Sequence, residues 1–143
     1  MSIGNYCRRS ICKVTPDATI VRVAQILRDE HVGSVIVVQD QKPIGIVTDR
    51  DITVRVLAED RDPATTKVSE IMSKPLVTVP PEAGVAEAAR LMRGARIRRV
   101  PVVTKEGRLF GVIAMDDLMI RFARQFSALS RTVRREQQNE DRP

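Results

Sequence analysis

The sequence is poor in aromatic residues and contains no long apolar run. Tryptophan is absent, and one tyrosine and three phenylalanines make up 3% of the 143 residues. The core must therefore be aliphatic, and few rings are present on which nucleic-acid bases could stack. No run approaches the ~18 apolar residues that a membrane-crossing helix needs. Residues 1–13 carry two arginines without the apolar stretch of a secretory signal. We therefore expect no membrane association and a cytoplasmic location.

Residues that commonly bind metals or act as nucleophiles are also scarce. The two cysteines, Cys7 and Cys12, match neither a CxxC motif nor a paired zinc ligand set, and His31 is the only histidine. We expect reduced thiols that are buried or half-buried, a surface histidine and no metal. The sequence also lacks a nucleophile–base pairing and a glycine-rich phosphate loop, so we do not expect an enzyme.

Positive charge is in excess and unevenly distributed. The 24 Lys and Arg against 18 Asp and Glu give a net charge of +6, with arginines gathered at 96–99 and along 121–135. Such a balance suits either nucleic acid or a phosphate-bearing small molecule. The scarcity of aromatics and an apolar stripe on the final basic helix disfavour nucleic acid. It remains an alternative that a steep salt dependence of binding would support.

An internal repeat organises the chain. The apolar quartet at 20, 23, 24 and 27 recurs 65 residues later at 85, 88, 89 and 92. The segment 35–38 (VIVV) returns at the same shift as 100–103 (VPVV). After one inserted residue, GIV at 45–47 returns as GVI at 111–113. Two copies with so long a period indicate one duplicated supersecondary unit and not a solenoid.

Each copy shows the same order of predicted elements. The quartets have the i, i+3, i+4, i+7 spacing of one helical face, and β-branched runs predict buried strands that turns join into hairpins. A helix closes each copy, over about 49–59 and from about 116 onward. We predict an α/β (α+β) fold in which two βαββα units pack around a pseudo-two-fold axis, with an extended C-terminal helix. The expected divisions are 1–60 for the first repeat with its N-terminal segment, 61–76 for a linker, 77–130 for the second repeat and final helix, and 131–143 for a polar, disordered tail.

Three motifs, in order, resemble one known family. The segment 45–51 (GIVTDRD) resembles the G-h-x-T-x-x-D signature of CBS domains, in which h is apolar. Residues 97–103 (IRRVPVV) resemble the family's basic pair before an h-P-V strand, and 68–72 (VSEIM) resembles the segment leading into a second repeat. Over about residues 12–120, the chain is similar to a stand-alone, bacterial-type tandem CBS pair, or Bateman module.

The resemblance implies roles for the signature residues. Its aspartate carries over to Asp51 and Asp117, whose carboxylates would accept hydrogen bonds from two ribose hydroxyls. Its threonine carries over to Thr48, which would bond a phosphate, whereas the second copy has Ala114. The competing interpretation is a capping box, in which Thr48 and Asp51 only begin a helix. Because Asp117 is kept where no threonine can cap, a ligand role is favoured.

Other candidate residues would complete a nucleotide site. Arg98 and Arg99 would contact phosphate through guanidinium groups, unless they are only solvated arginines before a strand. Arg50 would line the cleft, or lie on the surface at a helix start. Val14 with Thr15, and Val77 with Thr78, resemble the segments that hold the adenine edge through backbone groups.

The resemblance also implies a function. We expect a non-catalytic sensor of energy or metabolites that binds AMP, ADP, ATP, NAD or S-adenosylmethionine between the repeats. Such a module would take part in signal transduction as a homodimer and act on a regulated protein that the sequence does not identify. The alternative is a dimerisation scaffold with no physiological ligand.

Overall fold

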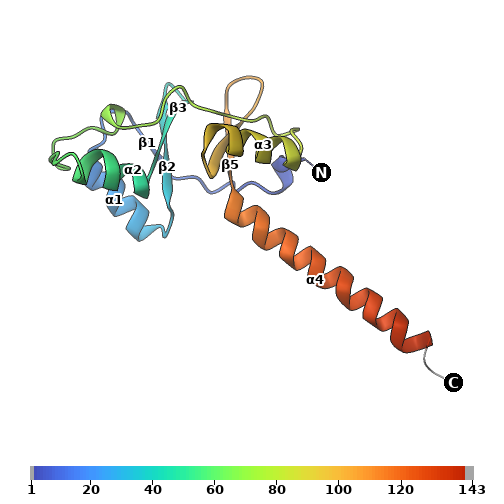
Figure 1. Cartoon of the computed structure of the whole chain (residues 1–143). Helices are drawn as coiled ribbons and strands as arrows, with labels where there is room; N and C mark the ends of the chain where they lie inside the picture. The colour runs from blue at the N-terminus through green and yellow to red at the C-terminus, as the bar shows by residue number, and fades with distance from the viewer. Residues whose placement is uncertain (1, 141–143) are drawn as a thin grey trace.

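Two similar halves, each built from one copy of the repeat, make up the structure. The computed structural model describes residues 2–140, and the side chains as far as residue 133. The first half contains β1 (Lys13–Val14), α1 (Ile20–Asp29), β2 (Ser34–Gln39), β3 (Lys42–Thr48), α2 (Asp49–Ile52) and the π-helical η2 (Thr53–Leu57). The second half contains α3 (Val85–Ala95), β4 (Arg99–Val103), β5 (Leu109–Ala114) and α4 (Met115–Glu140). The halves lie side by side and α4 projects away from them (Figure 1). The predicted fold is confirmed.

The sheets repeat the same pairing in both halves. β2 and β3 are antiparallel with Val35 opposite Val47, and β4 and β5 are antiparallel with Val100 opposite Ile113. β1 adds a short parallel strand beside β2, while its counterpart in the second half is the single parallel bridge from Val79 to Val102. The first strands are therefore shorter than a βαββα unit suggests.

The segment before each repeat packs into the core of the other half. The 3-10 helix η1 (Ile3–Asn5) contributes Ile3 to the core of the second half, whereas η3 (Val68–Glu70) contributes Val68 to the core of the first. The Ile3 N–H donates to Ala83 O at 2.8 Å, and the Val68 N–H donates to Ala18 O at 2.8 Å. This exchange of lead-in segments ties the two halves together. The linker predicted over 61–76 thus contains part of a core.

The signature glycines make room for the lead-in segments. A Cβ on Gly45 would lie 2.5 Å from Sδ of Met72, and a Cβ on Gly111 would lie 2.5 Å from Sγ of Cys7. Both contacts are far inside van der Waals distance, so only glycine allows a side chain to cross these strands so closely. Met72 and Cys7 are themselves 65 residues apart, which extends the repeat to the N-terminus.

The two closing helices differ in length. In the first half, α2 passes into η2 and the helical segment ends at Leu57, whereas α4 continues to Glu140. The helix therefore extends into the segment 131–143 for which the sequence predicts disorder. Residues 134–140 are Arg, Glu, Gln and Asn, mostly strong helix formers, and no glycine or proline interrupts them. Residues 141–143 lie outside the described part of the chain.

Residues 2–140 contain neither a membrane-spanning helix nor a cluster of metal-binding side chains. None of the helices described there is both long and apolar enough to cross a membrane. In the same part of the chain, no group of three or more His, Cys, Asp or Glu residues is placed to hold a metal ion. Cys7 is buried, Cys12 is half-buried and His31 is exposed, as predicted.

Candidate functional site

A cavity of about 210 Å³ lies where the two halves meet. The first half supplies the N-terminal segment and the start of β2, and the second half supplies the starts of β4 and α4 and the end of β5. Its walls combine acidic, basic and apolar side chains, among them Asp117, Arg8, Arg99, Ile11 and Cys12. The cavity thus brings the carboxylate of the second signature, predicted to bind ribose, together with one of the two arginines predicted to bind phosphate.

Arg8 forms a bidentate ion pair with this carboxylate. Arg8 Nε donates to Asp117 Oδ2 and Nη2 donates to Oδ1, both at 2.8 Å. The Arg8 backbone is fixed as well, since its N–H donates to Val112 O at 2.8 Å and its O accepts from the Val112 N–H at 3.0 Å. The hydrogen bond to Asp117, followed by its charge, raises the pKa of Arg8. Asp117 is only 19% exposed, so both of its oxygens are engaged in a largely covered position.

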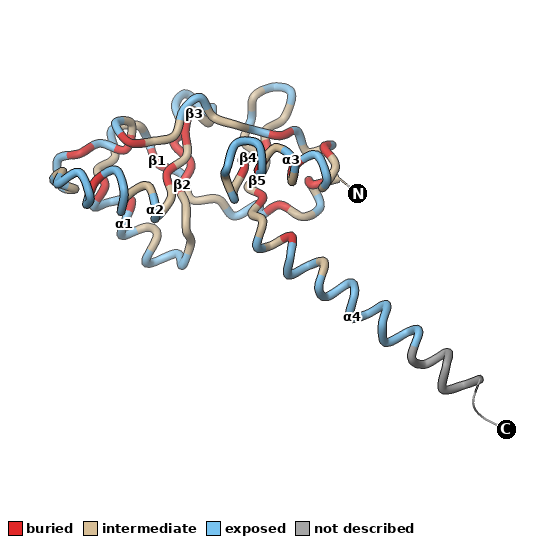
Figure 2. The backbone as a smooth tube through the Cα atoms, viewed as in Figure 1, coloured by how far each residue is buried: buried red, intermediate tan, exposed pale blue. Residues whose placement is uncertain are grey.

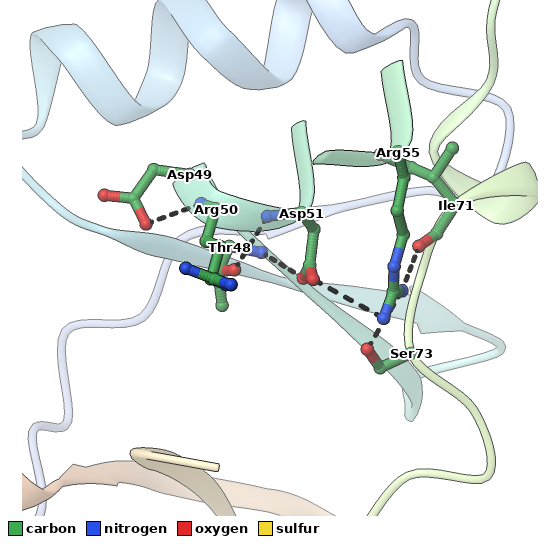
Figure 3. Close-up of polar contacts among 7 residues, drawn as sticks. All are labelled: Thr48, Asp49, Arg50, Asp51, Arg55, Ile71 and Ser73. Carbon is green, nitrogen blue, oxygen red and sulfur yellow. Dashed lines mark hydrogen bonds and ion pairs between the residues drawn. The ribbon is translucent and has the colours of Figure 1, made fainter. Parts of the chain in front are cut away.

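In the first half, the corresponding carboxylate belongs to a capping box (Figure 3). The Asp51 N–H donates to Thr48 Oγ1 at 3.2 Å, and the Thr48 N–H donates to Asp51 Oδ2 at 2.8 Å. The remaining oxygen, Oδ1, lies 3.6 Å from Nη2 of Arg55. The interpretation of Thr48 and Asp51 as a helix cap is therefore confirmed. It leaves Oδ1 available to a ligand, since no hydrogen bond from the described residues reaches this oxygen.

Arg55 links this cap to the lead-in segment of the second repeat. Its Nη1 donates to Ile71 O at 2.7 Å and to Ser73 Oγ at 3.1 Å (Figure 3). The Ser73 N–H donates to Ile46 O at 3.0 Å, as the Arg8 N–H does to Val112 O in the other half. Ser73 and Arg8 are therefore equivalent positions. The first half has a short hydroxyl side chain at the position where the second half has a guanidinium.

The two predicted phosphate-binding arginines point to different surroundings. Arg99 lines the cavity, and its guanidinium packs against Gly33, where an added Cβ would lie 2.5 Å from Nη2. Arg98 is exposed and forms an ion pair with Asp116 at the start of α4. Position 33 therefore has to be small for Arg99 to keep this position.

The predicted adenine segments lie partly away from the cavity. Val14 is buried, and both it and Thr15 border a separate surface hollow. The Thr15 hydroxyl donates to Asp17 at 2.6 Å and is the main cause that lowers the pKa of that carboxyl. Val77 is half-buried, Thr78 is exposed, and neither belongs to a strand.

Within the cavity, Ile11 and Cys12 form the apolar edge that the sequence places at Val14 and Thr15. At the 65-residue shift, Cys12 corresponds to Val77. The repeat therefore makes Val77, a predicted adenine-binding residue, the equivalent of a residue that lines the cavity. Arg50 is exposed at the start of α2, where its N–H donates to the Asp49 side chain at 2.9 Å.

Sequence reasoning missed the N-terminal contribution to the site. Arg8, Ile11 and Cys12 lie in the N-terminal segment of the first predicted division, and none of them was predicted to be a site residue. A signal existed, because Ile3 and Cys7 match Val68 and Met72 at the same shift of 65. Extending the repeat towards the N-terminus would have aligned Arg8 with Ser73 as equivalent positions.

Comparison with known proteins identifies the family. The model of the CBS domain matches twice, over residues 3–58 and 68–124. The chain belongs to the CBS domain family. The two matches begin at the lead-in segments, in agreement with the exchange of these segments between the halves.

Relatives and a solved structure agree with this assignment. The chain is 36% identical to protein MK0525 of Methanopyrus kandleri over 83% of its own length and 61% of that protein, so it spans about three fifths of this relative. It is 35% identical to the CBS domain-containing protein YhcV of Bacillus subtilis, over 83% of this chain and 84% of YhcV. The CBS domain pair of protein MJ0100, solved in complex with 5'-methylthioadenosine and S-adenosyl-L-methionine, has the same fold. It has a TM-score of 0.79 and 23% identity, over 87% of this chain and 98% of that one.

Proposed function

We propose that this CBS pair is a non-catalytic regulatory module that binds an adenosine-containing ligand in clefts between its repeats. The observation that carries the proposal is the cavity in which Asp117, Arg99 and the apolar edge of Ile11 and Cys12 meet. An adenosine phosphate offers vicinal hydroxyls, an anionic group and an apolar base, which these groups match in kind. The MJ0100 pair, which shares the fold, was solved with two adenosyl compounds.

The two clefts do not have equal affinity in this proposal. In the first, Asp51 Oδ1 can accept a ribose hydroxyl, because its one described ionic partner, Arg55 Nη2, is 3.6 Å away. Thr48 lies beside Asp51. In the second, a ribose has to displace the bidentate Arg8 from Asp117, and Ala114 offers no hydroxyl. We therefore assign the tighter site to the cleft of Asp51. From the 65-residue repeat we assign Arg98 and Arg99 to the phosphate side of this cleft. We assign Val77 to its base side.

The ligand is an adenine nucleotide or an adenosyl compound, and AMP, ADP, ATP, NAD and S-adenosylmethionine are the candidates. In this proposal, the module senses energy or metabolite state in the cytoplasm, acts as a homodimer and passes the signal to a separate regulated protein. Occupancy of the clefts then shifts the module between conformations that its partner distinguishes.

Calorimetric titration of the whole chain with each candidate tests this function, with 2'-deoxy-AMP as the matched control. Micromolar binding of one ribonucleotide that is strongly weakened by loss of the 2'-hydroxyl is expected. No heat from any candidate, with an unchanged melting temperature, would favour the dimerisation scaffold. Binding of RNA or DNA that weakens steeply with salt would favour the nucleic-acid alternative.

A further inference from the structure

The projecting helix α4 carries an exposed apolar stripe with a coiled-coil repeat. Its members alternate in spacing by three and four residues: Met119, Phe122, Phe126, Leu129 and Val133. Phe126 is 72% exposed and Leu129 is 65% exposed, and only Phe122 is partly covered by the core of the second half. We call these five residues the α4 seam. In Figure 2 the helix beyond the two halves is exposed along its described length.

Such a stripe needs a partner. Large apolar side chains gathered on one exposed face mark an interaction surface in a water-soluble helix. Isolated helices are also marginal in water unless an apolar face is packed. The CBS family match ends at residue 124, so Phe126, Leu129 and Val133 lie beyond the shared fold. The C-terminal part of the α4 seam therefore lies outside the two matched repeats.

The spacing of the seam suits a helix as its partner. A strict 3.5-residue period drifts by about 20° per heptad around a straight helix, and two helices compensate for the drift by supercoiling around each other.

The charges beside the seam select a second copy of the same helix. The positions that flank a coiled-coil seam hold Ala123, Gln125, Ser130 and Thr132, all uncharged. Arg121, Arg124 and Arg131 lie at the outer heptad positions, away from the seam. Two identical α4 helices can therefore approach without facing like charges. A membrane or an acidic partner helix would favour arginines at the edge of the stripe, where none occurs between residues 119 and 133.

We propose that two copies of the chain associate through their α4 seams in a two-helix, two-fold symmetric interface. This interface specifies the surface of the proposed homodimer and does not depend on nucleotide binding. The exposed seam covers about two heptads, fewer than the three or four that make an independent coiled coil. The association is therefore expected to be reversible and concentration-dependent.

Sedimentation of the whole chain over a concentration series, without nucleotide, tests the proposal. Phe126→Glu places an acid in the seam, and the matched control Ile120→Glu places the same acid on the opposite face of α4, where Ile120 is 53% exposed. We expect Phe126→Glu to weaken dimerisation about a hundredfold, since it replaces a buried apolar contact with facing like charges. Ile120→Glu should leave dimerisation unchanged. Circular dichroism and melting should show that both variants keep the fold, because neither residue lies in a core.

Three results would overturn the proposal. One is a wild-type chain that stays monomeric at high concentration, and another is a dimer that survives Phe126→Glu, which would place the interface on other helices. A third is a monomer that sediments with phosphatidylserine vesicles and loses this binding with Phe126→Glu, which would identify a membrane as the partner. The titration with nucleotides is separate, so failure of the seam leaves the ligand proposal standing, and the reverse holds as well.

Discussion

The two halves carry the same signature carboxylate but give it different partners. Asp51 caps its own helix and faces Arg55 one turn further on, so its hydrogen bonds and ion pair are with residues within four positions of it. Asp117 is held instead by Arg8, which is 109 residues away in the chain. Duplication thus preserved the position of the acid while its surroundings diverged.

As a result, the acid has a different role at each of the two equivalent positions, Asp51 and Asp117. In the first half, the acid at the third helical position satisfies a backbone N–H, which is a local contribution to stability. In the second half, it neutralises an arginine that lines the cavity. A ribose that approaches Asp51 adds to the existing contacts, but one that approaches Asp117 has to replace them. The proposed difference in affinity follows from this contrast.

The largest effect is expected from the carboxylate of the first cleft. Asp51→Ala should weaken ribonucleotide binding about a hundredfold, because hydrogen bonds to a charged acceptor contribute more than neutral ones. It should destabilise the fold by about 1 kcal/mol, because the Thr48 N–H loses the carboxylate that accepts its hydrogen bond. Calorimetry measures the first effect and thermal melting the second.

Asp51→Asn is the matched control that separates ligand binding from capping. Its amide oxygen can still accept from the Thr48 N–H, so stability should change little. The amide cannot accept both ribose hydroxyls, so affinity should still fall strongly. If affinity and stability fell in proportion in both variants, Asp51 would be only a helix cap.

Much of this comparison could be predicted from the sequence, because a 65-residue shift aligns both the apolar pattern and the two aspartates. The cap at Thr48 could be predicted too, since it depends on residues within one turn. The ion pair of Arg8 with Asp117 could not, because the exchange of lead-in segments brings its partners together from opposite ends of the chain. The extent of α4 was also missed, because its polar end resembles a disordered tail in composition although its residues are strong helix formers.

A second prediction converts the second cleft into a copy of the first. Arg8→Ser combined with Ala114→Thr introduces at both positions the residues of the equivalent sites, Ser73 and Thr48. In the Asp51→Asn background, which silences the first cleft, the double variant should bind ribonucleotide about tenfold more tightly than the background alone. The ion pair is exposed at Arg8, whose side chain is 61% accessible, and this limits the gain from its removal.

The single variants separate the two contributions. Arg8→Ser alone should provide most of the gain in affinity, while Ala114→Thr should mainly raise the melting temperature by capping α4. A loss of affinity with Arg8→Ser would show that Arg8 contacts the ligand and does not compete with it.

A third prediction concerns the contact between Gly33 and Arg99, which joins the two halves. Gly33→Ala forces the end of a flexible side chain to move, since the new Cβ would lie 2.5 Å from Nη2. Stability should change by less than about 1 kcal/mol, within the usual range for surface substitutions. Affinity for ATP should fall severalfold while affinity for adenosine stays constant, as titration of both would show. An equal loss of affinity for ATP and for adenosine would show that Arg99 does not contact the phosphate.

The smallest effect is expected at Cys12, which reports on occupancy of the second cleft alone because Val77 stands at the equivalent position of the first. Burial raises the pKa of the Cys12 thiol, so little thiolate exists at neutral pH, and alkylation should quicken as the pH rises towards that pKa. Ligand in the second cleft should slow this alkylation by a few-fold, and mass spectrometry can separate Cys12 from Cys7, which is buried in the core.

In the wild type, protection of Cys12 should require a higher ligand concentration than the one at which most of the heat of binding is released. The Arg8→Ser variant should bring the two concentrations closer together. Protection that follows the main heat of binding in the wild type would mean that the clefts fill together, and the contrast between Asp51 and Asp117 would then have no bearing on affinity.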